Sequence, residues 1–342
     1  MAKELVLAVA GSGKTTKILD AISKEKRCLV VTYTNENLRS LESGLINKFG
    51  SIPNTVTLAT YFSFLYSFCY RPFFSYGLRD KGVFWELPGT FPTKDKIRHY
   101  ITANSYLYGN RLAKLVNECG GLPKVISRLE TFFDIFLVDE VQDFAANDFN
   151  LLMALSRAEM EIMFVGDFYQ HTFDTSRDGN IRTNLHKRGL EPYIKEFEVN
   201  DFAVDVTSLG RTHRCSPTVC EFISNVLGIE IASHRADDTS VPVIEDGERA
   251  CALFADDSKV KLFFQDYRKY PCNSNNWGRC KGLNGYDDVC VVLNKKSADL
   301  FRKGELKSLP DSSLNKLYVA CSRANGDLYI LFEEQIKDFK TA

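Results

Sequence analysis

A short segment near the start of the sequence has the residue types that hold phosphate groups. Residues 8–16 read Ala-Val-Ala-Gly-Ser-Gly-Lys-Thr-Thr, after the apolar run 5–9 and before a helix-like stretch. Such a strand, loop and helix directs backbone N–H groups at phosphate oxygens, while the lysine contacts the β- and γ-phosphates and the threonine hydroxyl binds Mg²⁺. The expected nucleotide-binding residues are Ala10, Gly11, Ser12, Gly13, Lys14, Thr15 and Thr16, with Thr15 on the metal.

A second chemical signal is an acidic pair at the end of an apolar run. Phe136-Leu-Val leads directly into Asp139 and Glu140. Ligands of open α/β sheets bind at the carboxyl ends of strands, so Asp139 can hold Mg²⁺ and Glu140 can accept a proton from an attacking water. Alone, the pair is equally typical of a charged loop after a core strand. Together with Lys14 it favours nucleoside triphosphate hydrolysis.

The elements that position these residues follow from alternating apolar runs and helix-like segments. This alternation predicts an α/β fold with parallel sheets covered on both faces. Thr34 is the expected N-cap of a helix that stops at Gly50. In the first half we expect strands at 28–33, 55–58, 134–138 and 161–165, and helices at 35–48, 60–70, 94–103, 106–118 and 123–132. In a second unit from about 201 we expect strands at 204–209, 251–254, 288–293 and 327–332, helices at 216–227 and 312–321, and loops at 232–248 and 270–287.

Composition narrows the class of protein. With 342 residues and 44% apolar residues, the chain can build two cores. We expect no membrane span, because no run approaches about 18 apolar residues, and no signal-peptide pattern precedes the first strand. Ten cysteines without a Cys-x-x-Cys pair favour a reduced, cytoplasmic protein over a disulfide or zinc framework. Cys272 and Cys280 are the one pair to examine for a metal.

Segment 71–128 differs from the rest of the chain in charge. It carries ten Lys and Arg residues against four acids, whereas the whole chain has a net charge of −1. Aromatic residues are interleaved with these cations: Phe73, Phe74, Tyr76, Phe84, Trp85, Phe91, Tyr100, Tyr106 and Tyr108. Cations for phosphates and rings for bases are what single-strand binding requires. A basic surface over a small aromatic core explains the composition equally well.

The phosphate loop, the acidic pair and several further segments resemble the motifs of the UvrD/Rep/PcrA group of superfamily 1A helicases, and they occur in the same order along the chain. Asp139-Glu-Val-Gln-Asp143 resembles motif II of that group, behind the phosphate loop of motif I. The other matching segments are 30–35 for motif Ia, 57–61 for the next motif, 165–170 for motif III, 212–214 for motif IV, 280–284 for motif V and 317–324 for motif VI.

The resemblance implies two tandem RecA-like P-loop NTPase domains that bind ATP and Mg²⁺ between them, with a small helical insertion in the first. The first domain would comprise 1–64 and 129–200, the insertion 65–128, and the second domain 201–342 with a minimal further insertion at about 232–272. The implied catalytic residues are Lys14, Asp139, Glu140, Gln170, Arg214 and Arg323, with Asp139 also on Mg²⁺. The implied nucleotide contacts include His213 and Gly282, and the implied DNA contacts are Thr32, Tyr33, Asn35, Thr57 and Phe173.

Some positions depart from the family pattern. Ala8 replaces a glycine of motif I, Ala59 a histidine, His213 the aromatic residue that packs on adenine, and Asn284 the glutamate of motif V. Little room is left before motif I for the family's adenine-reading glutamine, and the interval between motifs IV and V is short. The leading hypothesis is therefore a compact ATPase that translocates 3′→5′ on single-stranded DNA or unwinds partial duplexes.

Two other hypotheses stay open on the sequence. The compact architecture also suits a nucleotide-gated DNA-sensing subunit that regulates a partner, for example a nuclease in an antiphage complex. A small-molecule kinase explains only the phosphate loop, and it leaves Gln170 and the segment around Arg323 without a role.

Overall fold

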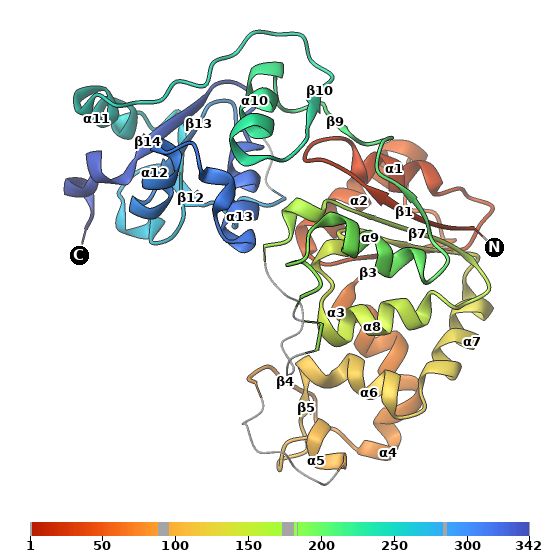
Figure 1. Cartoon of the computed structure of the whole chain (residues 1–342). Helices are drawn as coiled ribbons and strands as arrows, with labels where there is room; N and C mark the ends of the chain where they lie inside the picture. Colours follow the sequence, from red (N-terminus) through yellow and green to blue (C-terminus); the bar gives the residue numbers. More distant parts are fainter. Residues whose placement is uncertain (1, 88–95, 173–180, 183, 283–285, 342) are drawn as a thin grey trace. The chain divides into compact units, whose positions relative to one another are not determined.

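The computed structural model describes residues 2–87, 96–172, 181–182, 184–282 and 286–341 (Figure 1). The chain divides into two compact units. The first comprises Met1–Val6, Thr15–Gly166 and Phe173–Asp205, and the second comprises Leu7–Lys14, Asp167–Thr172 and Val206–Ala342. The phosphate loop and the segment after residue 166 therefore belong with the C-terminal part of the chain.

A six-stranded sheet forms the centre of the first unit, in the order β3-β2-β6-β7-β1-β8. Its strands are β1 (Lys3–Leu7), β2 (Cys28–Thr32), β3 (Val56–Thr60), β6 (Ile135–Val138), β7 (Glu161–Gly166) and β8 (Ala203–Asp205). The pairs β2–β3, β2–β6, β6–β7 and β1–β8 are parallel. Every residue of β2 and β6 is buried, as expected of central parallel strands covered on both faces. The expected α/β class with parallel sheets is confirmed.

Helix α2 of the first unit begins and ends at the residues that the sequence predicts. The Thr34 side chain accepts a hydrogen bond from the Asn37 N–H (3.1 Å), and Gly50 ends the helix with a left-handed φ of 82°. The helices outside the insertion are α1 (Lys14–Ala21), α2 (Asn35–Phe49), α3 (Tyr61–Ser63), α8 (Ala146–Leu155) and α9 (Leu190–Glu198), and α7 (Leu122–Phe132) begins in the insertion and ends after it.

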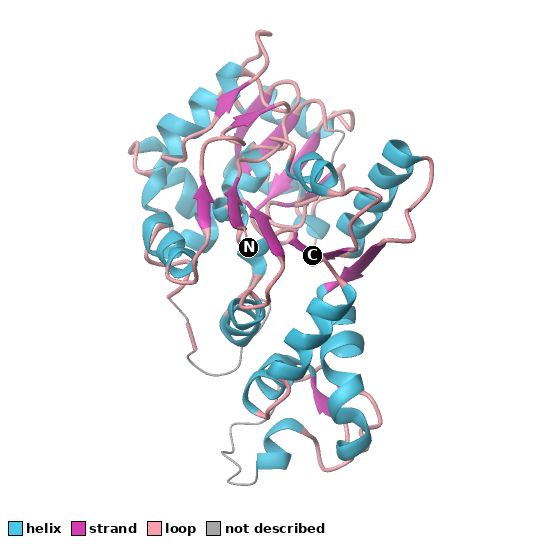
Figure 2. Cartoon of the chain, turned by 90° about the vertical axis from the view of Figure 1, so that its right-hand side faces the viewer, coloured by secondary structure: helices cyan, strands magenta, loops and turns pink. Residues whose placement is uncertain are grey.

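The insertion forms the lower end of the first unit in Figures 1 and 2. It contains η1 (Phe64–Ser75, a π-helix), α4 (Tyr76–Leu78), β4 (Val83–Phe84), α5 (Lys96–Tyr100), β5 (Leu107–Tyr108) and α6 (Leu112–Glu118). The helix expected at 106–118 starts later than predicted, because Leu107 and Tyr108 instead pair in parallel with β4.

An aromatic ladder runs along the helical stretch that opens the insertion. Phe62, Tyr66, Tyr70 and Phe74 stack in sequence, with centroids 5.8, 5.7 and 5.9 Å apart and ring planes within 10°, 22° and 4°. The four rings are spaced by four residues and so follow one face of the helix. The Tyr70 hydroxyl donates to Asp80 (2.5 Å), which ties the ladder to the chain that follows.

The second unit is built on a four-stranded parallel sheet in the order β12-β11-β13-β14. Its strands are β11 (Val260–Phe263), β12 (Ser274–Asn276), β13 (Val289–Leu293) and β14 (Leu328–Phe332), and a separate parallel pair joins β9 (Arg211–Thr212) to β10 (Ala232–Ser233). The helices are α10 (Pro217–Phe222), continued by η5 (Ile223–Leu227), α11 (Gly247–Ala255), α12 (Lys295–Arg302) and α13 (Asp311–Cys321).

In the second half of the chain, the structure differs from the sequence prediction at several elements, among them β10, which lies in the expected loop 232–248. Residues 251–254 lie in α11, because Asp246 caps that helix at the Arg249 N–H (2.8 Å) and a short apolar run fits a helix as well as a strand. The strand expected at 204–209 is β8, which pairs with β1 in the first sheet. The polar strand β12 lies inside the expected loop 270–287, since its pairing with β11 is made by the backbone.

The described part of the chain shows neither a cluster of metal-binding side chains nor a helix that could span a membrane. Within the described residues, no group of three or more His, Cys, Asp or Glu side chains could hold a metal ion. All ten cysteines are free, and burial raises the pKa of the Cys280 thiol to about 11. No helix in the described part of the chain is long and apolar enough to span a membrane.

The first sheet offers a test of pH-dependent stability at Asp134, which precedes β6. The Arg27 guanidinium donates to both carboxylate oxygens (3.1 and 2.6 Å) and, with the Arg27 N–H, holds the Asp134 pKa at about 2. A lowered folded-state pKa stabilises the fold above the unfolded value of about 3.9, and that contribution is lost as the pH falls toward 2.

Asp134→Asn is therefore expected to lower the Tm slightly at pH 7 and to make its decline between about pH 5 and pH 2 shallower. The effect should be small, because both side chains are more than 40% exposed. Thermal unfolding across this pH range, with Asp238→Asn at an exposed position as control, measures it. Parallel pH profiles for the wild type and Asp134→Asn would contradict the assignment.

Candidate nucleotide site

The loop after β1 has the backbone shape that a phosphate cradle requires. Gly11 and Gly13 have φ values of 71° and 96°, in the left-handed region that favours glycine. The Ser12 hydroxyl donates to the Val9 carbonyl (2.8 Å) and closes the turn. Helix α1 begins at Lys14, so the N–H groups of its first turn lack intrahelical acceptors and can bind an anion.

Within the second unit, the loop lies directly against the segment after β9. A Cβ atom at Gly11 would lie 2.7 Å from Thr212 Oγ1 and 2.8 Å from Arg214 Cβ, so no side chain fits there. The Gly11 carbonyl accepts a hydrogen bond from the His213 N–H (2.9 Å). The structure thus brings together two sequence-predicted groups that are separated by about 200 residues.

Two arginines lie in the same unit, Arg323 buried and Arg214 partly buried. Arg323 is 3% exposed and its Nε donates to the Val319 carbonyl (3.4 Å), whereas Arg214 donates to the Ser322 carbonyl (3.2 Å). Burial, and then the charge of Arg323, lower the pKa of Arg214 to about 10. The Arg214 guanidinium group is therefore charged at neutral pH, and an anion beside the two arginines would relieve the repulsion that it feels.

The acidic pair lies at the end of β6 in the first unit. Asp139 and Glu140 are 3% and 8% exposed. Thr32 donates to one Asp139 oxygen (3.4 Å), and the Glu140 N–H donates to the other (3.0 Å). Glu140 has a φ of 55°, a left-handed conformation that costs a non-glycine residue about 1–3 kcal/mol and is often found at functional sites.

A glutamine fixes the orientation of Glu140. The Gln142 side chain donates from Nε2 to Glu140 Oε2 and is fully buried. Its Oε1 lies against the backbone of Gly166, where a methyl group would overlap it. Gln142 therefore holds the Glu140 carboxylate from one side, a role that its place in the motif did not predict.

The residues expected on DNA are distributed over the first unit. Tyr33 and Asn35 follow β2, and Thr57 lies on the neighbouring strand β3, opposite Leu29. Thr32 is completely buried and contacts Asp139, so its hydroxyl supports the acidic pair. Phe173 lies outside the described residues, as does Asn284, whereas Gly282 is exposed with a φ of 80°.

His213, expected on the nucleobase, has a stacking partner that the sequence did not reveal. Its ring stacks on His234 with centroids 4.2 Å apart and planes within 10°. The parallel pairing of β9 with β10 places the two residues side by side, and the His234 N–H donates to the Thr212 carbonyl (2.8 Å). Desolvation, and then the His213 charge, lower the pKa of His234.

Trp85 carries an exposed ring that its neighbours hold in place, and the motifs assign no role to it. Its side chain is 68% exposed, yet its ring lies 4.6 Å from Phe62 between centroids and presses on Gly109, where a Cβ atom would be 3.1 Å from the indole. An exposed ring that is held in place loses little entropy when a base stacks on it.

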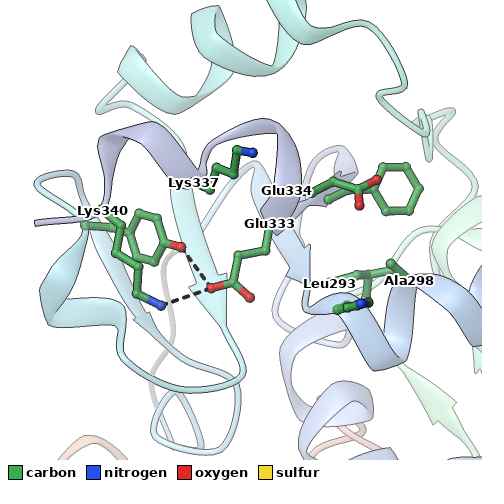
Figure 3. A pocket seen from close by; sticks show the side chains of 9 residues that line it. Leu293, Ala298, Glu333, Glu334, Lys337 and Lys340 are labelled. Atoms are coloured by element: carbon green, nitrogen blue, oxygen red, sulfur yellow. Dashed lines mark hydrogen bonds and ion pairs between the residues drawn. The ribbon is translucent and has the colours of Figure 1, made fainter.

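A pocket in the second unit, of about 230 Å³, opens beside the ends of β13 and β14 (Figure 3). Glu333 accepts hydrogen bonds there from the Tyr270 hydroxyl (2.8 Å) and Lys340 (3.5 Å). None of the motif residues lines this pocket. We therefore do not assign it to the nucleotide site.

Comparison with known proteins gives a fold-level likeness only. No protein-family model and no curated protein matches the chain. A structure of arterivirus nonstructural protein 10 (helicase) is 13% identical with a TM-score of 0.49, and the match covers 96% of this chain and 59% of that one. A PRRSV helicase structure gives 12% and 0.48, with 99% and 54% covered. A complex of arterivirus nonstructural protein 10 (helicase) with DNA gives 14% and 0.46, with 96% and 60% covered.

The chain thus spans a little over half the length of these proteins. Likenesses at this level of identity and superposition carry no functional assignment. Function has to be argued from the residues of the phosphate loop, the acidic pair and the arginines.

Gly11→Ala tests the close packing of the phosphate loop. The substitution forces a left-handed φ on alanine and places a methyl group against Thr212 and Arg214, so the free energy of unfolding should fall by about 1–3 kcal/mol and ADP binding should be lost. Denaturant unfolding and calorimetric titration measure both effects. Gly247→Ala is the matched control, because a Cβ atom there meets open space. Equal stability and equal ADP binding for the two variants would refute this loop geometry.

Proposed function

We propose that the chain is an ATP-dependent single-stranded DNA translocase or helicase of the superfamily 1A type, moving 3′→5′. The observation that carries the proposal is the close packing of the phosphate loop on Arg214, whose pKa is lowered by desolvation and then by the charge of Arg323. A glycine loop beside a partly buried and a buried arginine is suited to a chain of phosphates.

Binding of the nucleotide is assigned to the loop and the residues that follow it. Backbone amides from Gly11 to Thr16 and the Lys14 ammonium would neutralise the β- and γ-phosphates. His213, with its stacked partner His234, offers an exposed imidazole face to the base. Imidazole stacking is not selective, so we expect weak discrimination between purine bases.

The metal fits the first unit, to which Thr15, Asp139 and Glu140 all belong. A buried carboxylate and a threonine hydroxyl are oxygen donors of the kind Mg²⁺ prefers. Bound there, Mg²⁺ would neutralise charge on the β- and γ-phosphates. Glu140, oriented by Gln142, would accept the proton of the attacking water.

The cations would act on the charge that develops during phosphoryl transfer. Gln170 would contact the γ-phosphate, and Arg214 and Arg323 would stabilise the equatorial oxygens. Buried guanidinium groups are effective in this role because little water screens them, and such arginine fingers contribute about 10³–10⁵ in rate. When the γ-phosphate leaves, the anion that holds these cations is removed. Hydrolysis would therefore release the arginines and allow their segments to move.

For the DNA, the proposal draws on the aromatic residues of the first unit. Tyr33 and the held ring of Trp85 offer surfaces on which bases can stack, and the insertion carries the basic residues that suit a phosphate backbone.

Lys14→Ala and Glu140→Gln are expected to abolish ATP hydrolysis, and in the wild type single-stranded DNA should stimulate it several-fold. The first change removes the phosphate cation and the second removes the base. Steady-state phosphate release with single-stranded DNA, duplex DNA and RNA measures both. Lys24→Ala and Glu25→Gln, exposed positions after α1, are charge-matched controls. Turnover that is identical with and without nucleic acid would exclude a motor, and stimulated turnover with neither translocation nor strand displacement would favour a DNA-sensing subunit.

Trp85→Ala should weaken binding of single-stranded DNA by about 1–3 kcal/mol, the usual value of one stacked base. Fluorescence anisotropy over a salt series measures this, and the salt dependence should persist because the phosphate contacts remain. Phe132→Ala, which removes a half-exposed ring on α7 outside the insertion, is the control. Equal affinities for the two variants would remove Trp85 from the DNA path.

A further inference from the structure

Tyr318 on α13 joins two segments of the nucleotide site through a single hydroxyl group. The side chain is completely buried. Its oxygen accepts a hydrogen bond from the Ala10 N–H in the phosphate loop (2.9 Å) and lies 3.2 Å from Asp167 Oδ2. All three residues belong to the second unit.

The chemistry of the groups fixes the direction of both bonds. The Ala10 N–H can only donate, so the phenol oxygen accepts there and gives its own proton to the Asp167 carboxylate. Burial raises the pKa of Tyr318 well above its usual value, so the phenol keeps that proton at any physiological pH. A phenylalanine would take this hydroxyl away from the Ala10 N–H and from the Asp167 carboxylate, which costs the free energy of two buried hydrogen bonds.

Asp167 also contacts the segment that carries Gln170, so it links Tyr318 to that segment. Its other oxygen accepts from the Tyr169 N–H (3.1 Å) and caps η4 (Phe168–Gln170), while its carbonyl accepts from the Gln170 N–H (2.9 Å). Asn315, one turn before Tyr318, donates to the His171 carbonyl (2.9 Å). Helix α13 therefore contacts η4 at both of its ends.

The same helix leads to the two cations. Arg323 follows α13 by two residues and donates back to the Val319 carbonyl, and the Ser322 carbonyl accepts from Arg214. One rigid element thus contacts the loop that would hold the phosphates, the segment of the γ-phosphate sensor and both arginines.

We propose that Tyr318 is a positioning residue that sets the phosphate loop in register with Gln170 and Arg323, so that a nucleotide in the loop is coupled to the groups that act on its γ-phosphate. This inference rests on the proposed function and adds a regulatory contact to that site. Tyr318 itself touches no phosphate; it acts through the Ala10 amide and the Asp167 carboxylate.

The test compares two Tyr→Phe variants in the full chain. Tyr318→Phe removes the bonded hydroxyl. Tyr169→Phe removes the hydroxyl of a neighbouring ring, 6.2 Å away between centroids, for which the described residues offer no hydrogen-bond partner. We expect Tyr318→Phe to lower kcat by about tenfold, the effect of removing buried hydrogen bonds that position the loop and the sensor segment. The KM for ATP should change less than twofold, because the loop amides and Lys14 remain. Tyr169→Phe should lower kcat less than Tyr318→Phe does.

A second readout does not depend on catalysis. Without nucleotide, hydrogen exchange should accelerate in Tyr318→Phe at Ala10 and at residues 168–171, and Tyr169→Phe should leave it unchanged. If Tyr318→Phe does not fold, Asn315→Ala removes the second contact of α13 with η4 and is expected to lower kcat with the KM for ATP unchanged.

The outcomes separate the two proposals. A wild type that does not hydrolyse ATP defeats the proposed function, and exchange still reports on the contact. An active wild type whose Tyr318→Phe variant matches Tyr169→Phe in kcat and in exchange overturns the positioning role. A rise in the KM for ATP without loss of kcat also overturns it, since that result indicates a binding contact.

Discussion

The candidate nucleotide site of the second unit depends on one close approach, that of the Gly11 backbone to Thr212 and Arg214. Only glycine satisfies it, because the position combines a left-handed φ with a lack of space for Cβ. The contact places a row of backbone amides beside a partly buried guanidinium group. Replacing water by fixed dipoles and charges in this way is the usual means of making a phosphate site strong.

Two features of the candidate site residues raise the free energy of the folded state. Arg214 and Arg323 repel each other in a poorly solvated region, and Glu140 in the other unit keeps a left-handed backbone. The Ser322 carbonyl, which accepts from Arg214, and the Gln142 amide, which donates to Glu140, hold these groups where they are. Such costs are tolerated where a ligand recovers them, and they coincide here with the positions that the motifs single out.

Local patterns in the sequence predicted the local parts of the structure. The cap at Thr34, the stop at Gly50 and the buried strand before Asp139 follow from residue types within a few positions of each other. The predictions failed where pairing with a distant strand determines the secondary structure or the sheet that a segment joins. The residues of β8 join the first sheet because β1 is available beside them, and a polar strand such as β12 has no apolar signature. The contacts of His234 and Tyr318 were not predicted for the same reason, because their partners lie far away in the sequence.

The aromatic ladder on the helix of the insertion has a consequence for how this segment can vary. Its four rings stack only because they recur every four residues along a continuous helix, one of whose turns includes Pro72. A different aromatic residue at any rung preserves the column. A single inserted or deleted residue rotates every later ring by roughly a quarter of a turn and separates it from the one before. Homologous chains should therefore differ in this segment by exchange of side chains and keep its length constant.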